Sequence, residues 1–181
     1  MSLTSSTVFI TSNDQLQAYL NQCTGCRLIT DNATNIISQE VLQNLRLSFF
    51  KQSKLSFIVF TLQDESTNIG HWISITIYRN EKIAVFYDPA NNDNPYSTLL
   101  LQHVSTFCSL HGLALKVFPL KTQPLSSFAC GYHILYFVHL SHKLTLKDML
   151  GFKSRFTNYS LRSIELYILR TVLRRLKPIP L

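Results

Sequence analysis

The feature that most constrains the fold is a cysteine–glycine pair, Cys130-Gly131, which opens an uncharged apolar run. The run continues through Ile134–Val138 and is long enough for a buried helix. Such a helix needs a domain built around it, and it places the cysteine in its first turn. There, unpaired backbone N–H groups and the positive end of the helix dipole favour a thiolate over a thiol.

A second constraint comes from two strand patterns that share a short turn. Residues 71–78 alternate as a half-buried strand should, and the β-rich residues 83–87 follow after a four-residue loop. If that loop is symmetric, residue 88 lies opposite residue 73. Asp88 is then the diagonal neighbour of His71 on one sheet face, with Cα atoms about 7–8 Å apart. A slip of one residue would put the two side chains on opposite faces.

The rest of the chain predicts helices on either side of these strands. Ser or Asn caps followed by apolar residues at helical spacing predict helices, and β-rich runs bounded by Pro or polar residues predict strands. The predicted helices span about residues 12–25, 38–50, 99–112, 145–150 and 160–177, besides the one that begins at 130, and the further strands span 56–62 and 113–118. The fold class is therefore α+β, with a small, mostly antiparallel sheet flanked by helices.

The length of the chain predicts one domain, and its charge is concentrated in the C-terminal segment. The 181 residues, 46% of them apolar, predict a single domain over residues 1–181. Residues 143–181, a helical extension of that domain, hold nine lysines and arginines against two acidic residues, and so carry the whole net charge of +7. This predicts attraction to polyanions, nucleic acid first, with a solvated helix face as the equally weighted alternative. The candidate nucleic-acid-binding residues are Arg162, Arg170, Arg174, Arg175 and Lys177.

The cellular location follows from signals that the sequence lacks. Residues 1–6 show neither a basic region nor a continuous apolar region, so we expect no secretory signal. No apolar run approaches the length needed to cross a bilayer. The four cysteines are too few for a disulfide scaffold at this length. We therefore expect an intracellular protein in a reducing compartment, not a secreted one.

Four residues at predicted element ends have the types that cysteine-based acyl chemistry requires. Cys130 is the candidate nucleophile and His71 the candidate base, with Asp88 orienting the imidazole. Gln123, seven residues before the cysteine, is the candidate oxyanion donor together with the backbone N–H of Cys130. Each of these residues alone is more often structural, and only the joint pattern favours a thiol-dependent hydrolase.

Three residues that flank the histidine and the cysteine are candidates for substrate contact. Gly131 has no Cβ and would let a substrate backbone approach closely. Trp72, the only tryptophan, would shield the histidine or line the non-primed side of the cleft. Gly70 completes this candidate set.

Two pairs of potential metal ligands do not predict a metal site. Cys23 and Cys26 have zinc-like spacing, as do His139 and His142, but the two pairs lie 113 residues apart and nothing else supports a site. We therefore expect no metal and no cofactor for the chemistry itself.

Taken together, the motifs resemble a known protease family. Gly70-His71-Trp72, then Asp88-Pro89, then Gln123 and Cys130-Gly131 resemble the adenovirus maturation protease, adenain, over about residues 15–140. They also resemble the related proteases that release SUMO and other ubiquitin-like proteins. The Gln-to-Cys spacing of seven is similar to the viral branch, whereas Asp88 in place of Glu is similar to the deconjugating branch.

The resemblance implies an activity and its partners. It implies a cysteine endopeptidase that cleaves viral precursor proteins at Gly-containing sites during virion maturation. It also implies DNA as an activator and a location in the host nucleus, in the cytoplasm or inside the virion. Activation by a disulfide-linked peptide is not implied, because no cysteine lies in the strand before Gln123 and Cys108 lies in the preceding helix.

Three alternatives stay open at this point. The first is a protease that deconjugates a ubiquitin-like protein. The second is a catalytically silent, DNA-binding structural protein, whose DNA binding would not depend on Cys130. The third is a cysteine acyltransferase with the same triad, for which the sequence shows no donor site.

Overall fold

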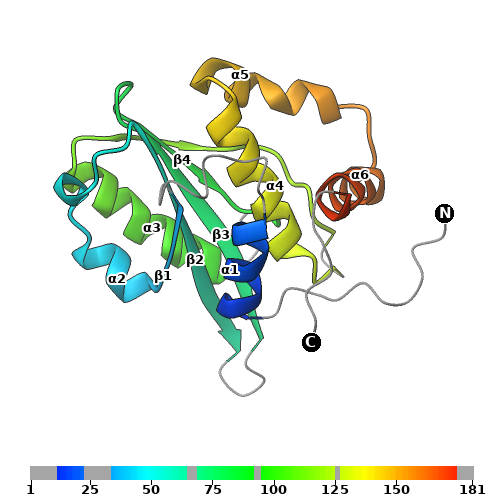
Figure 1. Cartoon of the computed structure of the whole chain (residues 1–181), viewed down its shortest axis with the longest axis horizontal. Helices are drawn as coiled ribbons and strands as arrows, with labels where there is room; N and C mark the ends of the chain where they lie inside the picture. The colour runs from blue at the N-terminus through cyan, green and yellow to red at the C-terminus, as the bar shows by residue number, and fades with distance from the viewer. Residues whose placement is uncertain (1–11, 23–33, 65–68, 92–94, 125–126, 175–181) are drawn as a thin grey trace.

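The computed structural model describes residues 12–22, 34–64, 69–91, 95–124 and 127–174. They form a five-stranded sheet with helices on both faces (Figure 1). The strands are β1 (Thr34–Ile37), β2 (Lys54–Asp64), β3 (Ile69–Tyr78), β4 (Ile83–Tyr87) and β5 (Ala114–Val117). The helices are α1 (Asn13–Gln22), α2 (Gln39–Asn44), α3 (Pro95–Leu110), α4 (Cys130–Lys143), α5 (Leu146–Gly151) and α6 (Leu161–Leu173), with 3-10 turns at Leu47–Phe49 and Phe152–Phe156.

The sheet is mixed, with its antiparallel strands at the centre. Its order is β1-β2-β3-β4-β5; β2, β3 and β4 pair antiparallel, and both edge strands pair parallel to their neighbours. This confirms the predicted α+β class. The strand β1 was not predicted, because its four residues are too short to show a periodic pattern.

The register of the β3–β4 hairpin is the predicted one. Ser74 pairs with Tyr87 and Tyr78 with Ile83, which places residue 88 beside residue 73. Lys82 closes the turn in the left-handed region, with φ 54°. The diagonal relation between His71 and Asp88 therefore holds in the structure.

The helices form two layers around the sheet. Helices α2 and α3 cover one face, and α4, flanked by α1 and α6, covers the other (Figure 1). The strands supply both cores by alternation: Ile73, Ile75 and Ile77 pack in the α3 core, whereas Trp72 and Tyr78 pack in the α4 core.

Helix α4 is the buried helix that the sequence predicts. Twelve of its 14 residues are buried. Its C-terminal end is capped from the sheet, because the Lys54 ammonium group donates to the carbonyls of Ser141, His142 and Leu144 at 3.4, 3.2 and 2.7 Å. A cation at this end also complements the negative pole of the helix dipole.

One helix is shorter than predicted. Instead of running to about residue 50, α2 ends at Asn44, and Leu45 is extended. Leu42 and Leu47 both pack in the α3 core. Five residues of α-helix would turn these two side chains about 140° apart, so the helix must end between them for both to be buried.

The basic segment packs onto α4 through α6. Ser160 caps α6 as predicted, with its hydroxyl accepting from the Ser163 N–H at 3.2 Å. The buried face of α6, formed by Ile164, Ile168, Leu169 and Val172, belongs to the same core cluster as α4. Among the helices that the structure describes, none combines the length and apolarity needed to span a membrane.

Candidate active site

The predicted histidine and aspartate form a buried pair at the end of the β3–β4 hairpin. His71 Nε2 lies 2.7 Å from Asp88 Oδ1, and the two residues are 4% and 2% exposed. The same carboxylate oxygen accepts the Ala90 N–H at 2.7 Å, which holds it in place at the end of β4. Since Nε2 faces the aspartate, Nδ1 is the nitrogen that remains for another partner.

The electrostatics of the pair favour a charged imidazole. Burial alone would lower the pKa of His71, but hydrogen bonds to Asp88 and Cys130 and the charges of both residues raise it to about 9. His71 is therefore an imidazolium at neutral pH, between a carboxylate and a sulfur atom. This is the arrangement in which an imidazolium stabilises a thiolate.

The cysteine stands at the first residue of α4. Cys130 is a free cysteine and is 7% exposed. The residue before it, Ala129, makes no side-chain cap. No capping oxygen from the N-cap side chain therefore competes with Cys130 for the positive pole of the helix dipole. The prediction of a thiol at a helix N-terminus beside His71 is consistent with this placement.

The predicted oxyanion donor lies in the loop between β5 and α4. The backbone N–H groups of Gln123 and Thr122 both donate to the Pro89 carbonyl at 3.0 Å, which ties the loop to the Asp88-Pro89 turn. The Gln123 amide is 5% exposed, and its Nε2 donates to the Ser127 carbonyl at 2.6 Å. A primary amide has a second N–H, so one donor remains for a substrate oxygen.

Known structures with this arrangement of elements were found. No family model and no curated protein sequence matches the chain. The structure of ChlaDub1 from Chlamydia trachomatis superposes with a TM-score of 0.60 at 11% identity, over 88% of this chain and 89% of that one. The ASFV pS273R protease superposes with a TM-score of 0.52 at 12% identity, over 81% of this chain and 62% of that one.

The fold is that of the adenain-like cysteine proteases. HopZ1a, in a structure with IP6, also shares the adenain-like fold at a TM-score of 0.52 and 13% identity, over 87% of this chain and 60% of that one. At these identities the likeness establishes the fold and leaves the chemistry to the residues of this chain.

Of the three predicted substrate-contact residues, Trp72 and Gly131 are buried and Gly70 is half-buried. Trp72 is 2% exposed, with its ring centroid 4.8 Å from that of Phe60. A Cβ on Gly70 would come within 1.8 Å of the Phe60 ring and would have to displace it, so packing alone favours glycine there. Gly131 is buried in the first turn of α4. Contact of these three residues with substrate stays a prediction.

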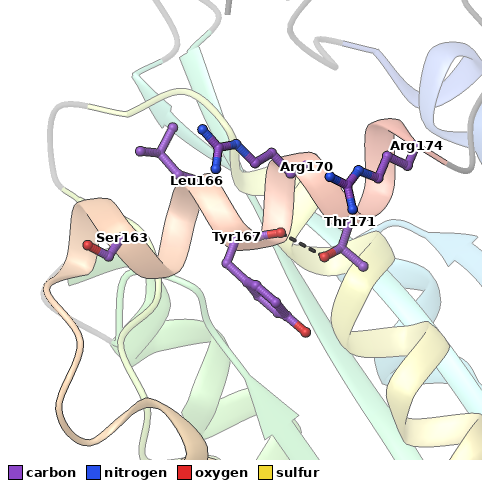
Figure 2. Close-up of a pocket in the computed structure, with 6 residues that line it drawn as sticks. All are labelled: Ser163, Leu166, Tyr167, Arg170, Thr171 and Arg174. Atoms are coloured by element: carbon purple, nitrogen blue, oxygen red, sulfur yellow. Dashed lines mark hydrogen bonds between the residues drawn. The ribbon is translucent and has the colours of Figure 1, made fainter. Parts of the chain in front are cut away.

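The described basic residues lie on the outside of α6. Arg162, Arg170 and Arg174 are exposed, while Arg175 and Lys177 lie outside the described residues. Arg170 and Arg174 stand one turn apart and, with Tyr167, line a shallow pocket of about 360 Å³ (Figure 2). The pocket includes none of the four candidate catalytic residues. Nucleic-acid binding at this face stays a prediction.

The structure adds polar residues behind Cys130 that the sequence analysis does not assign to the site. Tyr87 Oη lies 2.6 Å from Thr122 Oγ1, which lies 2.8 Å from His133 Nδ1. His133 Nε2 in turn lies 3.6 Å from Glu165 Oε2. The one signal that the sequence carries for them is that Glu165 is the only acidic residue of α6.

No metal site is found in the part of the chain that the structure describes. No three His, Cys, Asp or Glu side chains in those ranges are grouped to hold a metal ion. His142, one of the four residues of the zinc-like pattern, instead has Nε2 2.8 Å from Ser56 Oγ. Cys23 and Cys26 lie outside the described residues.

Proposed function

We propose that this chain is a cysteine protease with Cys130 as nucleophile, His71 as general base and acid, and Asp88 as the orienting carboxylate. The observation that carries the proposal is the buried His71–Asp88 pair, whose imidazole has a pKa raised to about 9 by Asp88 and Cys130. These are the residue types that thiol hydrolysis needs, and the adenain-like fold supports their assignment.

The residues support a two-step acyl transfer. The Cys130 thiolate attacks the scissile carbonyl carbon, and the oxyanion that forms accepts hydrogen bonds from the Gln123 amide and the Cys130 backbone N–H. His71 then donates its proton to the leaving amine as the C–N bond breaks, which leaves a thioester on Cys130. In the second step, His71 takes a proton from water, the hydroxide attacks the thioester, and the thiolate is regenerated.

For the substrate, we propose a protein cleaved after glycine, in the first instance a viral precursor during virion maturation. The ASFV pS273R protease, among the structures with this fold, supports a viral substrate. A ubiquitin-like conjugate is the second candidate, because a structure with the same fold is Cdu1 bound to ubiquitin, with a TM-score of 0.53 at 12% identity. Both substrates present glycine at the scissile bond, so the chemistry at Cys130 is the same.

The deciding experiment measures turnover of a fluorogenic peptide ending in Leu-x-Gly-Gly and of full-length ubiquitin-like fusions, by wild type and by Cys130→Ala. Cleavage that disappears in the variant supports the protease. Preference for the folded ubiquitin-like fusion over the peptide would replace the viral-precursor substrate by a conjugate. Absence of cleavage by wild type, with DNA bound equally by both proteins, would replace the protease by a silent structural protein.

A cysteine acyltransferase is the remaining candidate, and one observation favours it. HopZ1a with IP6 and CoA superposes with a TM-score of 0.50 at 13% identity, over 88% of this chain and 50% of that one. A thioester on Cys130 could pass its acyl group to an amine instead of water. Mass spectrometry of a substrate protein incubated with an acyl-CoA separates the two, since only a transferase adds the acyl mass.

DNA activation through α6 is proposed as the function of the basic segment. The exposed Arg162, Arg170 and Arg174 supply a cationic helix face, and phosphate contacts of this kind weaken with salt. Replacing Arg170 and Arg174 by Gln should abolish any stimulation of peptide cleavage by DNA and leave cleavage without DNA unchanged. Stimulation that survives in this double variant would contradict the proposal.

A further inference from the structure

Glu165 is an inward-facing acid on a helix whose other charged residues point to solvent. Its side chain is 17% exposed, and its Oε2 lies 3.6 Å from Nε2 of His133, which is fully buried in α4. Burial would raise the pKa of Glu165, but the neighbouring His133 ring and Ser127 side chain lower it below its usual value. Glu165 is thus an ionised carboxylate that reaches from α6 to both α4 and the loop before it.

The hydrogen-bond chain behind Cys130 has one consistent assignment of protons. Burial lowers the pKa of His133 and Glu165 offsets this only in part, so the imidazole is neutral. If Tyr87 donates to Thr122 and Thr122 donates to Nδ1, then His133 carries its proton on Nε2, toward Glu165. The opposite order would direct a lone pair of Nε2 at the carboxylate, which is repulsive. Glu165 therefore selects the tautomer of His133 and the direction of the chain.

The second branch from Glu165 passes through Ser127. The Ser127 hydroxyl accepts the Ala129 N–H at 3.1 Å, immediately before Cys130. The Ser127 carbonyl accepts the Gln123 amide at 2.6 Å. Ser127, which interacts with Glu165, thus contacts both components of the predicted oxyanion hole, the side-chain donor and the start of α4.

The two branches reach the loop on either side of Gln123. Thr122, which directly precedes Gln123, has its hydroxyl 2.8 Å from His133 Nδ1, while Ser127 on the other side lowers the pKa of Glu165 and so interacts with that carboxylate. The Gln123 Oε1 atom is buried and accepts no hydrogen bond from the described residues, so the amide is fixed only through its nitrogen. Its orientation therefore depends on where the Ser127 carbonyl is placed.

We propose that Glu165 is a positioning residue for the oxyanion hole, acting through Ser127 and through His133 and Thr122 on the Gln123 amide. This inference rests on the proposed protease function and gives the C-terminal segment a part in it. A displacement of about 1 Å at a catalytic group can cost roughly 100-fold in rate. Loss of the Glu165 charge should therefore lower kcat and leave KM nearly unchanged, because Glu165 does not touch substrate.

The test compares Glu165→Gln with Glu40→Gln, a matched change of an exposed acid on α2, across the sheet. Glu165→Gln should lower kcat for peptide hydrolysis about 10-fold to 100-fold, and Glu40→Gln should not change it. Alkylation of Cys130 by iodoacetamide should proceed at the wild-type rate in both, because sulfur displaces iodide from carbon and no oxyanion forms. Equal losses of alkylation and hydrolysis would overturn the inference, since they would indicate a general disturbance of the nucleophile.

A double-mutant cycle tests whether the effect passes through Gln123. If it does, Glu165→Gln should have little further effect on kcat in a Gln123→Ala background. Full additivity of the two effects would overturn the inference. If Glu165→Gln does not fold, Ser127→Ala, which removes the hydroxyl that interacts with Glu165 together with the acceptor of the Ala129 N–H, should show at least the same loss of kcat and the same cycle.

A measurement that needs no enzymatic turnover tests this inference separately from the proposed function. The side-chain amide signals of Gln123 in a ¹⁵N-labelled protein, assigned by their loss in Gln123→Ala, should shift in Glu165→Gln and stay in place in Glu40→Gln. A wild type that hydrolyses nothing contradicts the proposed function, yet these signals still test the positioning role. Unmoved Gln123 signals in Glu165→Gln would overturn it whether or not the protein is a protease.

Discussion

Two buried histidines lie at opposite ends of α4 and have opposite electrostatics. At the N-terminal end, His71 beside Cys130 has a pKa raised to about 9. At the C-terminal end, His142 has a pKa lowered to about 4 by burial and by the charge of Lys54. The two side chains are similarly buried, at 4% and 6% exposure, so burial does not explain the difference.

The difference lies in the partner that each imidazole meets. Burial lowers the pKa of both rings, and only His71 has a carboxylate, Asp88, to reverse the effect. His142 has a neutral hydroxyl, that of Ser56, and a nearby cation. One end of the helix thus maintains a charge that chemistry can use, and the other end maintains a neutral, hydrogen-bonded anchor.

The largest expected effect separates the two histidines by activity. His71→Ala should lower kcat/KM for peptide cleavage by about 1000-fold or more, as Cys130→Ala should, because the thiolate loses its base and its counter-charge. His142→Gln, which retains a group that can bond to Ser56, should leave kcat/KM within about threefold. Comparable losses in His71→Ala and His142→Gln would contradict the division between the two ends.

The next effect removes the carboxylate that distinguishes His71. Asp88→Asn should lower the midpoint of the His71 titration from about 9 toward its ordinary value near 6.5, because burial is then opposed by Cys130 alone. Activity at neutral pH should fall by about 100-fold or more, as the imidazole loses its charge and its orientation. NMR titration of the His71 ring protons and steady-state kinetics measure the two consequences. A midpoint that stays near 9 would show that Cys130 alone supports the charge.

Asp88→Asn also has a signature in stability. The folded-state pKa of His71 lies above its unfolded value near 6.5, so the stabilisation from the protonated ring is complete below pH 6.5. It is lost as the pH rises through about 9. Urea unfolding of wild type between pH 6.5 and 9 should show this loss, and Asp88→Asn should not.

His142 predicts the opposite pH dependence. Its folded-state pKa is depressed to about 4, so the unfolded chain takes up a proton first as the pH falls. The contribution of neutral His142 to the free energy of unfolding is therefore complete above pH 6.5 and is lost as the pH falls from 6.5 to 4. For a pKa shift of this size the loss is about 3 kcal/mol. Urea unfolding in this window should show a shallower decline for His142→Gln than for wild type. Parallel pH profiles for the two proteins would argue against a neutral His142.

The smallest expected effect concerns Lys54. Lys54→Met keeps the length of the side chain but removes the ammonium group that caps α4, and should lower the free energy of unfolding by about 1–2 kcal/mol. Because the cation also depresses the pKa of His142, that pKa should rise in the variant. Thermal unfolding and NMR titration of His142 measure both. Unchanged values would assign the low pKa to burial alone.

Local patterns predicted most of what places the candidate catalytic groups. The hairpin register, and with it the His71–Asp88 diagonal, follows from strand alternation and a four-residue turn within 18 residues of chain. The buried helix that begins at Cys130 follows from one apolar run. Both signals are local, and each is reinforced by a hydrophobic pattern that tolerates no slip.

The parts that were not predicted depend on pairs far apart in the chain. Lys54 meets the end of α4 across 87 to 90 residues, and no composition or periodicity of β2 indicates that one lysine will turn inward. Likewise, Glu165 and His133 are ordinary residues of two helices until those helices pack together. A four-residue parallel edge strand such as β1 is also specified mainly by its neighbour β2.

The order of elements along the chain has a consequence for biosynthesis. A ribosome that has completed α4 has already produced Cys130, His71 and Asp88, but it has not yet produced the α6 residues that cover α4. The side of α4 that α6 covers in the finished domain then still faces solvent, and the loop with Gln123 lacks the Glu165 carboxylate. The nascent chain should therefore acquire a competent thiol late, after α6 has left the exit tunnel. Delayed competence of this kind would keep the proposed peptidase from acting on the proteins made around it before its own domain has closed.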